Sequence, residues 1–289
     1  GDDGADPKLD DEDGITFSAP TVPVLGLRAE VPVLNPRAAA RIELSAFVSL
    51  PPSVSGVLSG WIDFNADGDW TDANEQMLKD QPVLGGPNQL SFLMPAGVKR
   101  GFTYARFRLS SGSGLGPAGP AQAGEVEDYL LLLQEVDYGD ALAVLGPAAH
   151  IRPEPPTVFL GADVDPDDDY QTSIDARGDD LDTDGDDEDG VTEISPLIAS
   201  AVTTVKVTAS KAGFLNIWVD YNGAKGFEFT PAAPDPSEYV NNSIIGHAGG
   251  AFSLNAGPNV VRFRVPDRIT SRLAFIGKYT RFENLTRLE

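Results

Sequence analysis

The chain lacks cysteine, has few basic residues and contains no long apolar run. Its 289 residues include no cysteine, which excludes disulfides, thiolate-bound zinc and a cysteine nucleophile. Only 21 Lys and Arg stand against 44 Asp and Glu, so the formal net charge is −23. Nucleic acid and anionic membranes are therefore not expected as partners. No apolar run approaches the roughly 18 residues that cross a bilayer, so we expect no membrane insertion of this fragment.

Catalytic motifs are also missing. The only imidazoles are His150 and His247, which lie in different segments, and neither a His-Glu-x-x-His nor a Gly-x-Ser-x-Gly pattern occurs. Carboxylates are so abundant that no particular pair of them indicates glycoside hydrolysis. We therefore predict that the chain is not an enzyme and has no catalytic residues.

What the chain has instead is aspartate, concentrated in one segment. Between Asp163 and Asp189, 13 of 27 residues are aspartate. Within this segment acidic residues alternate ahead of a glycine, as in calcium-binding loops, and Ca²⁺ accepts six to eight oxygen ligands at flexible geometry. We predict a calcium site here with the ligands Asp180, Asp182, Asp184, Asp186 and Asp189.

A second candidate loop begins at Asp63 and has the same spacing of oxygen side chains, with Gly68 at the turning position. Its expected ligands are Asp63, Asn65, Asp67, Asp69, Asp72 and Glu75. The twelfth position is Asn74 instead of the bidentate glutamate of an EF-hand, so ligands from elsewhere would have to complete the shell. The alternative for both loops is a solvated acidic turn whose Asp and Gly serve the backbone.

The sequence contains a diverged internal repeat. The hexapeptide that ends at Ile15 returns at 186–191 with only its last residue changed. Further similar segments follow in the same order: Trp61–Asn65 matches Trp218–Asn222, Ala96–Gly97 matches Ala256–Gly257, and Arg106–Arg108 matches Arg262–Arg264. Ordered matches of this kind predict two copies of one fold.

The periodicity within each copy is that of β-strands. Apolar residues alternate at Ile42, Leu44, Ala46, Val48 and Leu50 in copy one, and at Val205, Val207 and Ala209 in copy two. We predict an all-β chain of two β-sandwich domains, Ig-like or jelly-roll-like, in tandem. The expected parts are an acidic linker remnant at 1–14, a first domain at 15–135, an Asp-rich calcium-binding linker at 136–190 and a second domain at 191–289.

The segment Gly124-Glu125-Val126-Glu127-Asp128-Tyr129 resembles the signature of the GEVED domain of bacterial secreted and surface proteins. The resemblance covers copy one and the linker, while copy two has no second Glu-Val-Glu-Asp-Tyr. It implies an extracellular or cell-surface location in bacteria and a role in adhesion, or as an accessory domain beside a secreted enzyme.

The acidic residues of this signature give two alternatives. Glu125, Glu127 and Asp128 directly precede an apolar strand, and we hypothesise that they reach back to the Asp63 loop as the missing ligands. Alternatively, they pair with Arg106 and Arg108 on a neighbouring strand.

The function that we expect is that of a calcium-stabilised structural or adhesive fragment of a large bacterial surface protein. Its partners would be a surface ligand, either a protein or a glycan, and neighbouring domains of the same parent chain. The alternative is a carbohydrate-binding or accessory module of a secreted enzyme. Among the tryptophans, Trp61 and Trp218 occupy matching strand positions typical of a core, so Trp70 is the one that we expect to be exposed for sugar stacking.

Overall fold

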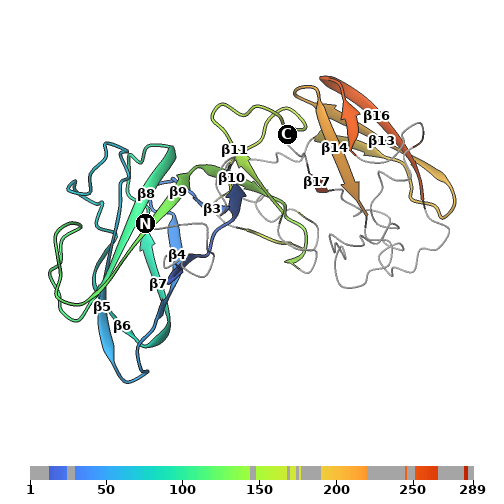
Figure 1. Ribbon diagram of the computed structural model, residues 1–289. Helices are drawn as coiled ribbons and strands as arrows, with labels where there is room; N and C mark the ends of the chain where they lie inside the picture. Colours follow the sequence, from blue (N-terminus) through green and yellow to red (C-terminus); the bar gives the residue numbers. More distant parts are fainter. Residues whose placement is uncertain are drawn as a thin grey trace. The chain divides into compact units, whose positions relative to one another are not determined.

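The structure is a computed structural model that describes residues 13–24, 30–143, 148–167, 170–173, 176, 190–219, 245, 251–265 and 283–285. The chain divides into two compact units, Gly1–Glu135 and Val136–Glu289, and Figure 1 shows the strands of each. All named elements in the described residues are strands, which confirms the prediction of an all-β chain. No helix of the described part has the length and apolar character needed to span a membrane.

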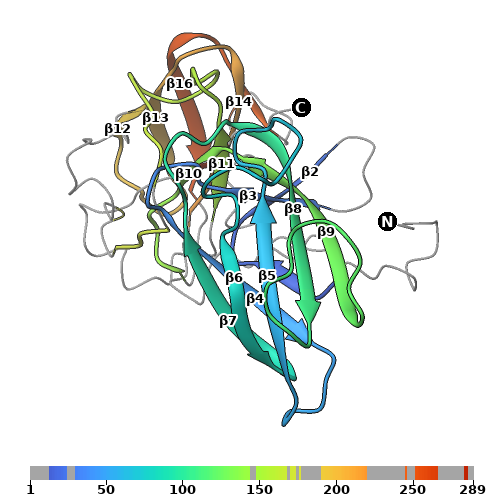
Figure 2. The same cartoon turned by 90° about the vertical axis from the view of Figure 1, so that its left-hand side faces the viewer.

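Unit 1 contains two sheets. A three-stranded sheet has the order β1-β4-β7, and a six-stranded sheet has the order β2-β3-β9-β8-β5-β6. All neighbouring strands are antiparallel except β3 and β9, which run parallel. Figure 2 shows strands β5, β6, β8 and β9 of the larger sheet lying side by side. The strands are β1 (Ile15–Phe17), β2 (Thr21–Pro23), β3 (Glu30–Leu34), β4 (Arg41–Val48), β5 (Ser55–Ile62), β6 (Leu78–Leu84), β7 (Gly86–Leu93), β8 (Gly101–Ser110) and β9 (Gly124–Leu133).

The core of unit 1 is built from side chains of both sheets. Strand β4 buries every second residue from Ile42 to Val48, as its sequence predicted, and Leu44 and Ala46 are almost fully buried. The predicted alternation was wrong for Leu50, which lies beyond the end of the strand and is exposed. These side chains belong to the same apolar cluster as Ile62 of β5 and Phe107 of β8. Each fully buried Leu, Ile or Phe contributes about 1.5–3 kcal/mol, so the two sheets are held together by their apolar faces.

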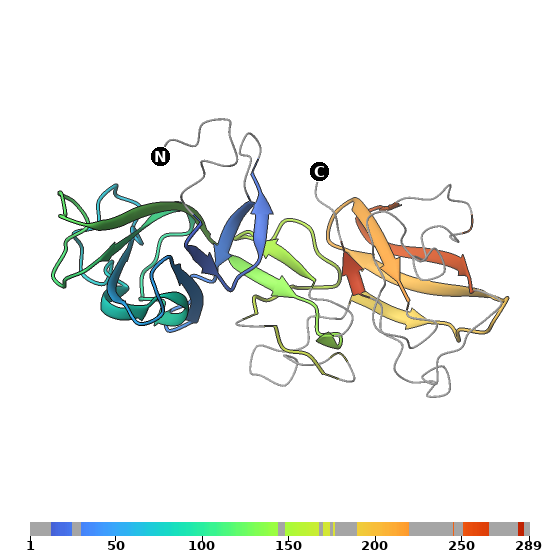
Figure 3. The same cartoon turned by 60° about the horizontal axis from the view of Figure 1, so that its bottom comes forward.

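Unit 2 has smaller sheets with the orders β10-β11, β12-β13-β16 and β15-β14-β17. Figure 3 shows its last strands in yellow to red. The predicted inward positions Val205, Val207 and Ala209 are buried in its core. The strands are β10 (Glu135–Tyr138), β11 (Ala149–Arg152), β12 (Val191–Ile194), β13 (Val202–Ala209), β14 (Gly213–Trp218), β15 (Phe252–Leu254), β16 (Gly257–Arg264) and β17 (Glu283–Leu285).

Described strands of unit 1 recur in unit 2, but β16 matches a different strand of unit 1 from the one that the sequence predicted. Both β7 and β16 begin with Gly-Pro-Asn. Each pairs with the strand whose other neighbour begins at the end of the acidic hexapeptide, giving the orders β1-β4-β7 and β12-β13-β16. In register, Asn88 lies opposite Ala46, and Asn259 lies opposite Val207. Strand β16 therefore corresponds to β7 and not to β8.

The side chains of these two asparagines confirm the correspondence. Asn88 accepts the N–H of Leu84 and donates to the carbonyls of Leu84 and Gly86. Asn259 makes the same three contacts with Asn255 and Gly257. The predicted matches of Arg106–Arg108 with Arg262–Arg264 and of Ala96–Gly97 with Ala256–Gly257 are therefore wrong. They rested on short stretches of similar sequence, whereas the pairing of strands defines which elements correspond.

Candidate metal centre

The loop from Asp63 to Glu75 joins β5 to β6 and is fixed at its start by the neighbouring strand β8. The Asp63 N–H donates to the carbonyl of Tyr104 at 3.1 Å, and the Thr103 hydroxyl donates to the Asp63 carbonyl. The next side chain, Phe64, is buried in the core of unit 1. The first acidic residue of the loop therefore sits on the rigid end of a central strand.

The Asp63 carboxylate organises the turn that follows. One of its oxygens accepts the Asp67 N–H at 3.2 Å and the other accepts the Gly68 N–H at 3.0 Å. Gly68 has a φ of +95°, a conformation that glycine adopts without steric cost. The glycine at the turning position thus allows the chain to fold back over Asp63.

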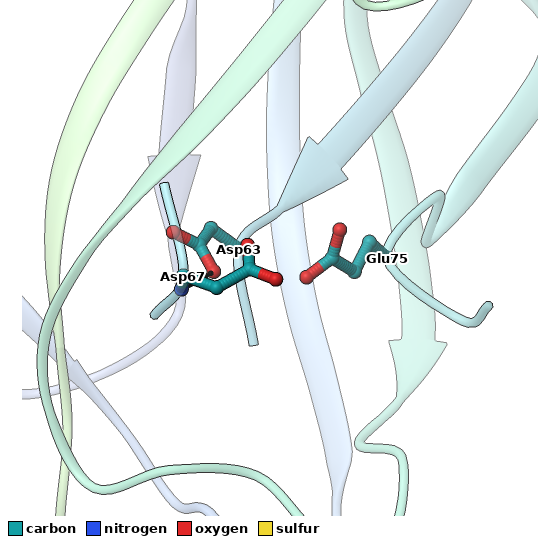
Figure 4. A group of neighbouring side chains, drawn as sticks. All are labelled: Asp63, Asp67 and Glu75. Atoms are coloured by element: carbon teal, nitrogen blue, oxygen red, sulfur yellow. Dashed lines mark hydrogen bonds between the residues drawn. The ribbon is translucent and has the colours of Figure 1, made fainter. Parts of the chain in front are cut away.

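This folding gathers the carboxylates into a group that can hold a metal ion. Oxygen atoms of Asp63, Asp67 and Glu75 lie within 4.8 Å of one another, and Figure 4 shows the carboxylate of Glu75 pointing toward the other two. Asp67 also belongs to a second group with Asp69 and Asp72, in which all three residues are exposed. The Asn65 amide nitrogen donates to two members of this second group, Asp67 and Asp72.

Glu75 is the residue that distinguishes this group from an ordinary acidic turn. Its side chain is 2% exposed, and Oε2 accepts the Asp72 N–H at 3.2 Å. Its Oε1 is buried without a hydrogen-bond partner in the described part of the chain. Burial raises the pKa of the Glu75 carboxyl, and the nearby Asp63, Asp72 and Asp67 raise it further, against the lowering effect of the Asp72 N–H.

The position of Glu75 accounts for the missing glutamate at the twelfth place of the loop. Asn74 occupies that place with a φ of +76°, and this left-handed residue brings the following side chain inward. The loop itself therefore supplies a buried carboxylate, one residue later than in an EF-hand.

The donor set determines which metals fit. The group offers carboxylate oxygens and contains neither imidazole nor thiolate, while the Asn65 side-chain oxygen accepts the Asp67 N–H at 2.9 Å. Such ligands suit hard cations, with Ca²⁺ favoured by a flexible and irregular oxygen shell and Mg²⁺ by a strict octahedron. Asp69 accepts both the hydroxyl and the N–H of Thr71, contacts that lower its pKa and keep it ionised.

The signature acids do not join this group. Tyr104 lies level with Asp63 and pairs with Leu130, three residues along β9 from Glu127. Three residues span about 10 Å of strand, and β8 separates β9 from β5. Glu127 instead accepts the Gly14 N–H at 3.2 Å and the Tyr129 hydroxyl at 2.7 Å. Our hypothesis that Glu125, Glu127 and Asp128 complete the Asp63 site is therefore not supported by the geometry.

The alternative pairing holds for one of the three acids. Asp128 receives two hydrogen bonds from Arg106, at 2.7 Å from Nε and 2.5 Å from Nη2. Arg108 is buried and donates to the backbone carbonyls of Gly116, Ala118 and Gly119. The two arginines thus hold the loop that joins β8 to β9, because Arg106 also reaches the Pro117 carbonyl.

The expected exposure of Trp70 is only partly met. Its side chain is half-buried, and the Arg106 guanidinium lies over its ring at 4.4 Å from the centroid. This contact joins the candidate metal loop to the arginine that Asp128 holds. Trp61 is buried, as its strand position predicted, whereas Trp218 at the matching position is only half-buried.

Several predicted positions lie outside the described residues. These are the linker ligands Asp180, Asp182, Asp184, Asp186 and Asp189. Conversely, the structure adds Thr103 and Tyr104 as residues that fix the backbone of Asp63. No sequence signal marks these two, because their contribution depends on strand pairing.

The comparison with protein families finds a match in unit 1. Residues 57–132 match the GEVED domain. The matched region runs from β5 to β9, so it contains the candidate metal loop, the two arginines and the signature, whereas strands β1 to β4 precede it. GEVED domains are typical of extracellular and surface proteins of bacteria. No curated protein matches the chain.

Proposed function

We propose that the chain is a calcium-stabilised structural or adhesive part of a bacterial extracellular or cell-surface protein. In this proposal it consists of two β-sandwich domains joined by an Asp-rich linker, and it has no catalytic activity. The observation that carries the proposal is the buried Oε1 of Glu75 beside Asp63 and Asp67, which has no hydrogen-bond partner among the described residues.

The unpartnered oxygen of Glu75 destabilises the metal-free loop. A buried carboxylate oxygen without a partner costs free energy, and neighbouring carboxylates add repulsion. A divalent cation among Asp63, Asp67 and Glu75 offsets both effects, since it supplies the missing partner and opposite charge. Calcium sites of extracellular modules have dissociation constants of about 0.1–1 mM, so such a site fills outside cells.

The role that follows is mechanical. Calcium binds the folded loop and not the unfolded chain, so it raises stability by RT ln(1 + [Ca²⁺]/Kd), which is about 1.4 kcal/mol at tenfold excess over Kd. The loop connects two strands of the larger sheet, β5 and β6. Calcium is thus expected to stiffen the first domain against unfolding.

The test is thermal unfolding of the whole chain in chelator and in millimolar calcium. Calcium should raise the melting temperature of the wild type, and Glu75→Gln should reduce that rise. Glu43→Gln is the matched control because Glu43 is exposed on β4, away from the loop. An equal rise in the wild type and in Glu75→Gln would contradict calcium binding at this site.

The linker is tested separately by small-angle scattering. If Asp180, Asp182, Asp184, Asp186 and Asp189 bind calcium, the ion offsets their repulsion and restricts the distance between the units. Calcium should then narrow the distribution of shapes of the wild type but not of a variant with Asp182→Asn and Asp184→Asn. Identical scattering of the wild type in chelator and calcium would contradict calcium binding by the linker.

A carbohydrate-binding role is the second candidate, and one observation favours it. Phe102 and Tyr104 are 52% and 59% exposed on the same face of β8, a central strand of the larger sheet. Exposed aromatic rings of this kind can stack on sugars, and they offer a better platform than Trp70, whose ring faces Arg106. Glycan retention that is lost in Tyr104→Ala and kept in Phe47→Ala, an exposed aromatic of β4, would establish this role.

A further inference from the structure

The signature segment on β9 sends its side chains to both faces of the sheet. Successive residues of a strand alternate, so Glu127 and Tyr129 point to one side and Asp128 to the other. Tyr129 packs against the core of unit 1, where its ring meets Phe17 and Phe107 edge to face at 6.5 and 5.8 Å. Glu127, 7% exposed, lies beside it.

These two side chains bind the start of β1, which belongs to the opposite sheet. The Ile15 N–H donates to the Tyr129 hydroxyl at 3.0 Å, and that hydroxyl donates to Glu127 at 2.7 Å. The second Glu127 oxygen accepts the Gly14 N–H at 3.2 Å. The hydrogen bonds therefore form a closed chain that joins the two sheets across the edge of the core.

Gly14 is needed in this arrangement for steric reasons. A Cβ on Gly14 would lie 2.7 Å from one Glu127 oxygen and 3.1 Å from the other. The Glu127 carboxylate has little freedom to move away, because it is buried and held by Tyr129. On its other side the Gly14 carbonyl accepts the Phe47 N–H at 2.7 Å.

We infer that Glu127 and Tyr129 of the signature form a clasp for the strand that enters the domain. The strand that fits the clasp has the pattern Gly-apolar-x-apolar, which Gly14, Ile15 and Phe17 supply, and the last two of these side chains are buried. The clasp fixes the point at which the preceding acidic segment joins the domain. This role is separate from metal binding, because the clasp lies away from the Asp63 group.

Copy two supports the specificity of the clasp. The same five residues, Asp-Asp-Glu-Asp-Gly, precede β12, but copy two lacks the Glu-Val-Glu-Asp-Tyr segment. A Cβ on Gly190 would instead meet Leu160, at 2.3 Å from its Cβ. The glycine is therefore required in both copies, and the carboxylate clasp belongs to the first copy.

The test is a double-mutant cycle in chelator, so that metal binding plays no part. Gly14→Ala should lower the stability of the wild type, and Glu127→Ala should abolish most of that loss because the oxygens that block the methyl group are gone. Gly112→Ala is the matched control, since a Cβ at Gly112 meets nothing within 4 Å. Additive effects of Gly14→Ala and Glu127→Ala would overturn the inference.

Hydrogen exchange provides a second readout that does not depend on the glycine variants. Tyr129→Phe keeps the ring in the core and removes only the hydroxyl. Exchange of the Ile15 amide should accelerate about tenfold, which corresponds to about 1.4 kcal/mol, while amides in the middle of β8 remain protected. Unchanged exchange at Ile15, or equal acceleration throughout the domain, would contradict a local clasp.

Discussion

Glu75 and Asp63 place carboxylate oxygens within 4.8 Å of each other although both side chains are buried. Two buried carboxylates at this separation repel each other and lose hydration. We predict that Glu75→Gln raises the free energy of unfolding in chelator by about 1 kcal/mol, the order expected when a buried charge becomes neutral. Urea unfolding measures this change, and a loss of metal-free stability in Glu75→Gln would contradict the burial of a charged, unpartnered oxygen.

The same comparison separates a metal site from an acidic turn that merely serves the backbone. In a backbone role, Glu75 contributes through the Asp72 N–H, which a glutamine oxygen also accepts. Metal-free stability would then hardly change, and Glu75→Gln would leave any effect of calcium on stability unaltered.

The pH dependence of stability tests the burial of Glu127. Burial raises the pKa of its carboxyl, and Glu125 and Asp13 raise it further, although Tyr129 and the Gly14 N–H act in the opposite direction. Because the folded state holds the proton more tightly, this group contributes stability that is complete below its ordinary value of 4.5 and is lost as pH rises through the raised pKa.

The free energy of unfolding of Glu127→Gln should therefore fall less than that of the wild type as the pH rises from about 4 to neutral. The measurement is the difference in unfolding free energy between wild type and variant across this range, in chelator. Glu43→Gln is the control, since Glu43 is exposed on β4 and is not among the groups that shift the pKa of Glu127. A difference that does not vary with pH would contradict the raised pKa.

Arg106 links the metal loop to the signature, and its geometry is specific to arginine. Its guanidinium makes two hydrogen bonds to Asp128 and lies over Trp70. Lysine cannot make both contacts in this geometry. Arg106→Lys should cost about 1 kcal/mol, because the ion pair is partly exposed and the stacking adds a similar small amount. Arg41→Lys, in an exposed pair with Glu43, should cost little in the same denaturant titration.

Asn88 and Asn259 close equivalent turns in the two units, and each makes three hydrogen bonds with the turn backbone. Asn88→Ala and Asn259→Ala should each cost about 0.5–1.5 kcal/mol, because water replaces the lost hydrogen bonds of the exposed turn only in part. Gln89→Ala is the control, since the Gln89 side chain donates to the Ser45 hydroxyl in an exposed hydrogen bond across the strands. Thermal unfolding should show comparable losses for both asparagines, and a loss confined to one unit would contradict the structural repeat.

The sequence predicted strands well and their alignment between the copies less well. The alternation at Ile42, Leu44, Ala46 and Val48 follows from one buried face, so local pattern alone gave the inward residues of β4. The match of β16 with β7 depends on pairing partners far away in the chain. A local tripeptide such as Arg106–Arg108 carries no information on those partners.

The candidate site shows the same limit. The spacing from Asp63 to Asp72 is local and marked the loop, since Asp63 binds its own turn. The burial of Glu75 depends on the left-handed Asn74, which the EF-hand spacing did not reveal. The hypothesis that Glu127 reaches the Asp63 loop failed because strand register decides which residues of β9 lie level with Asp63, and the sequence does not reveal that register.

The most direct measurement is isothermal titration of the whole chain with calcium, comparing wild type, Glu75→Gln and the control Glu43→Gln. We predict that the wild type and Glu43→Gln each bind one more calcium ion per chain than Glu75→Gln. The dissociation constant of this additional ion should be about 0.1–1 mM. Equal calcium binding by all three proteins, or no binding by the wild type, would contradict a metal centre at Asp63, Asp67 and Glu75.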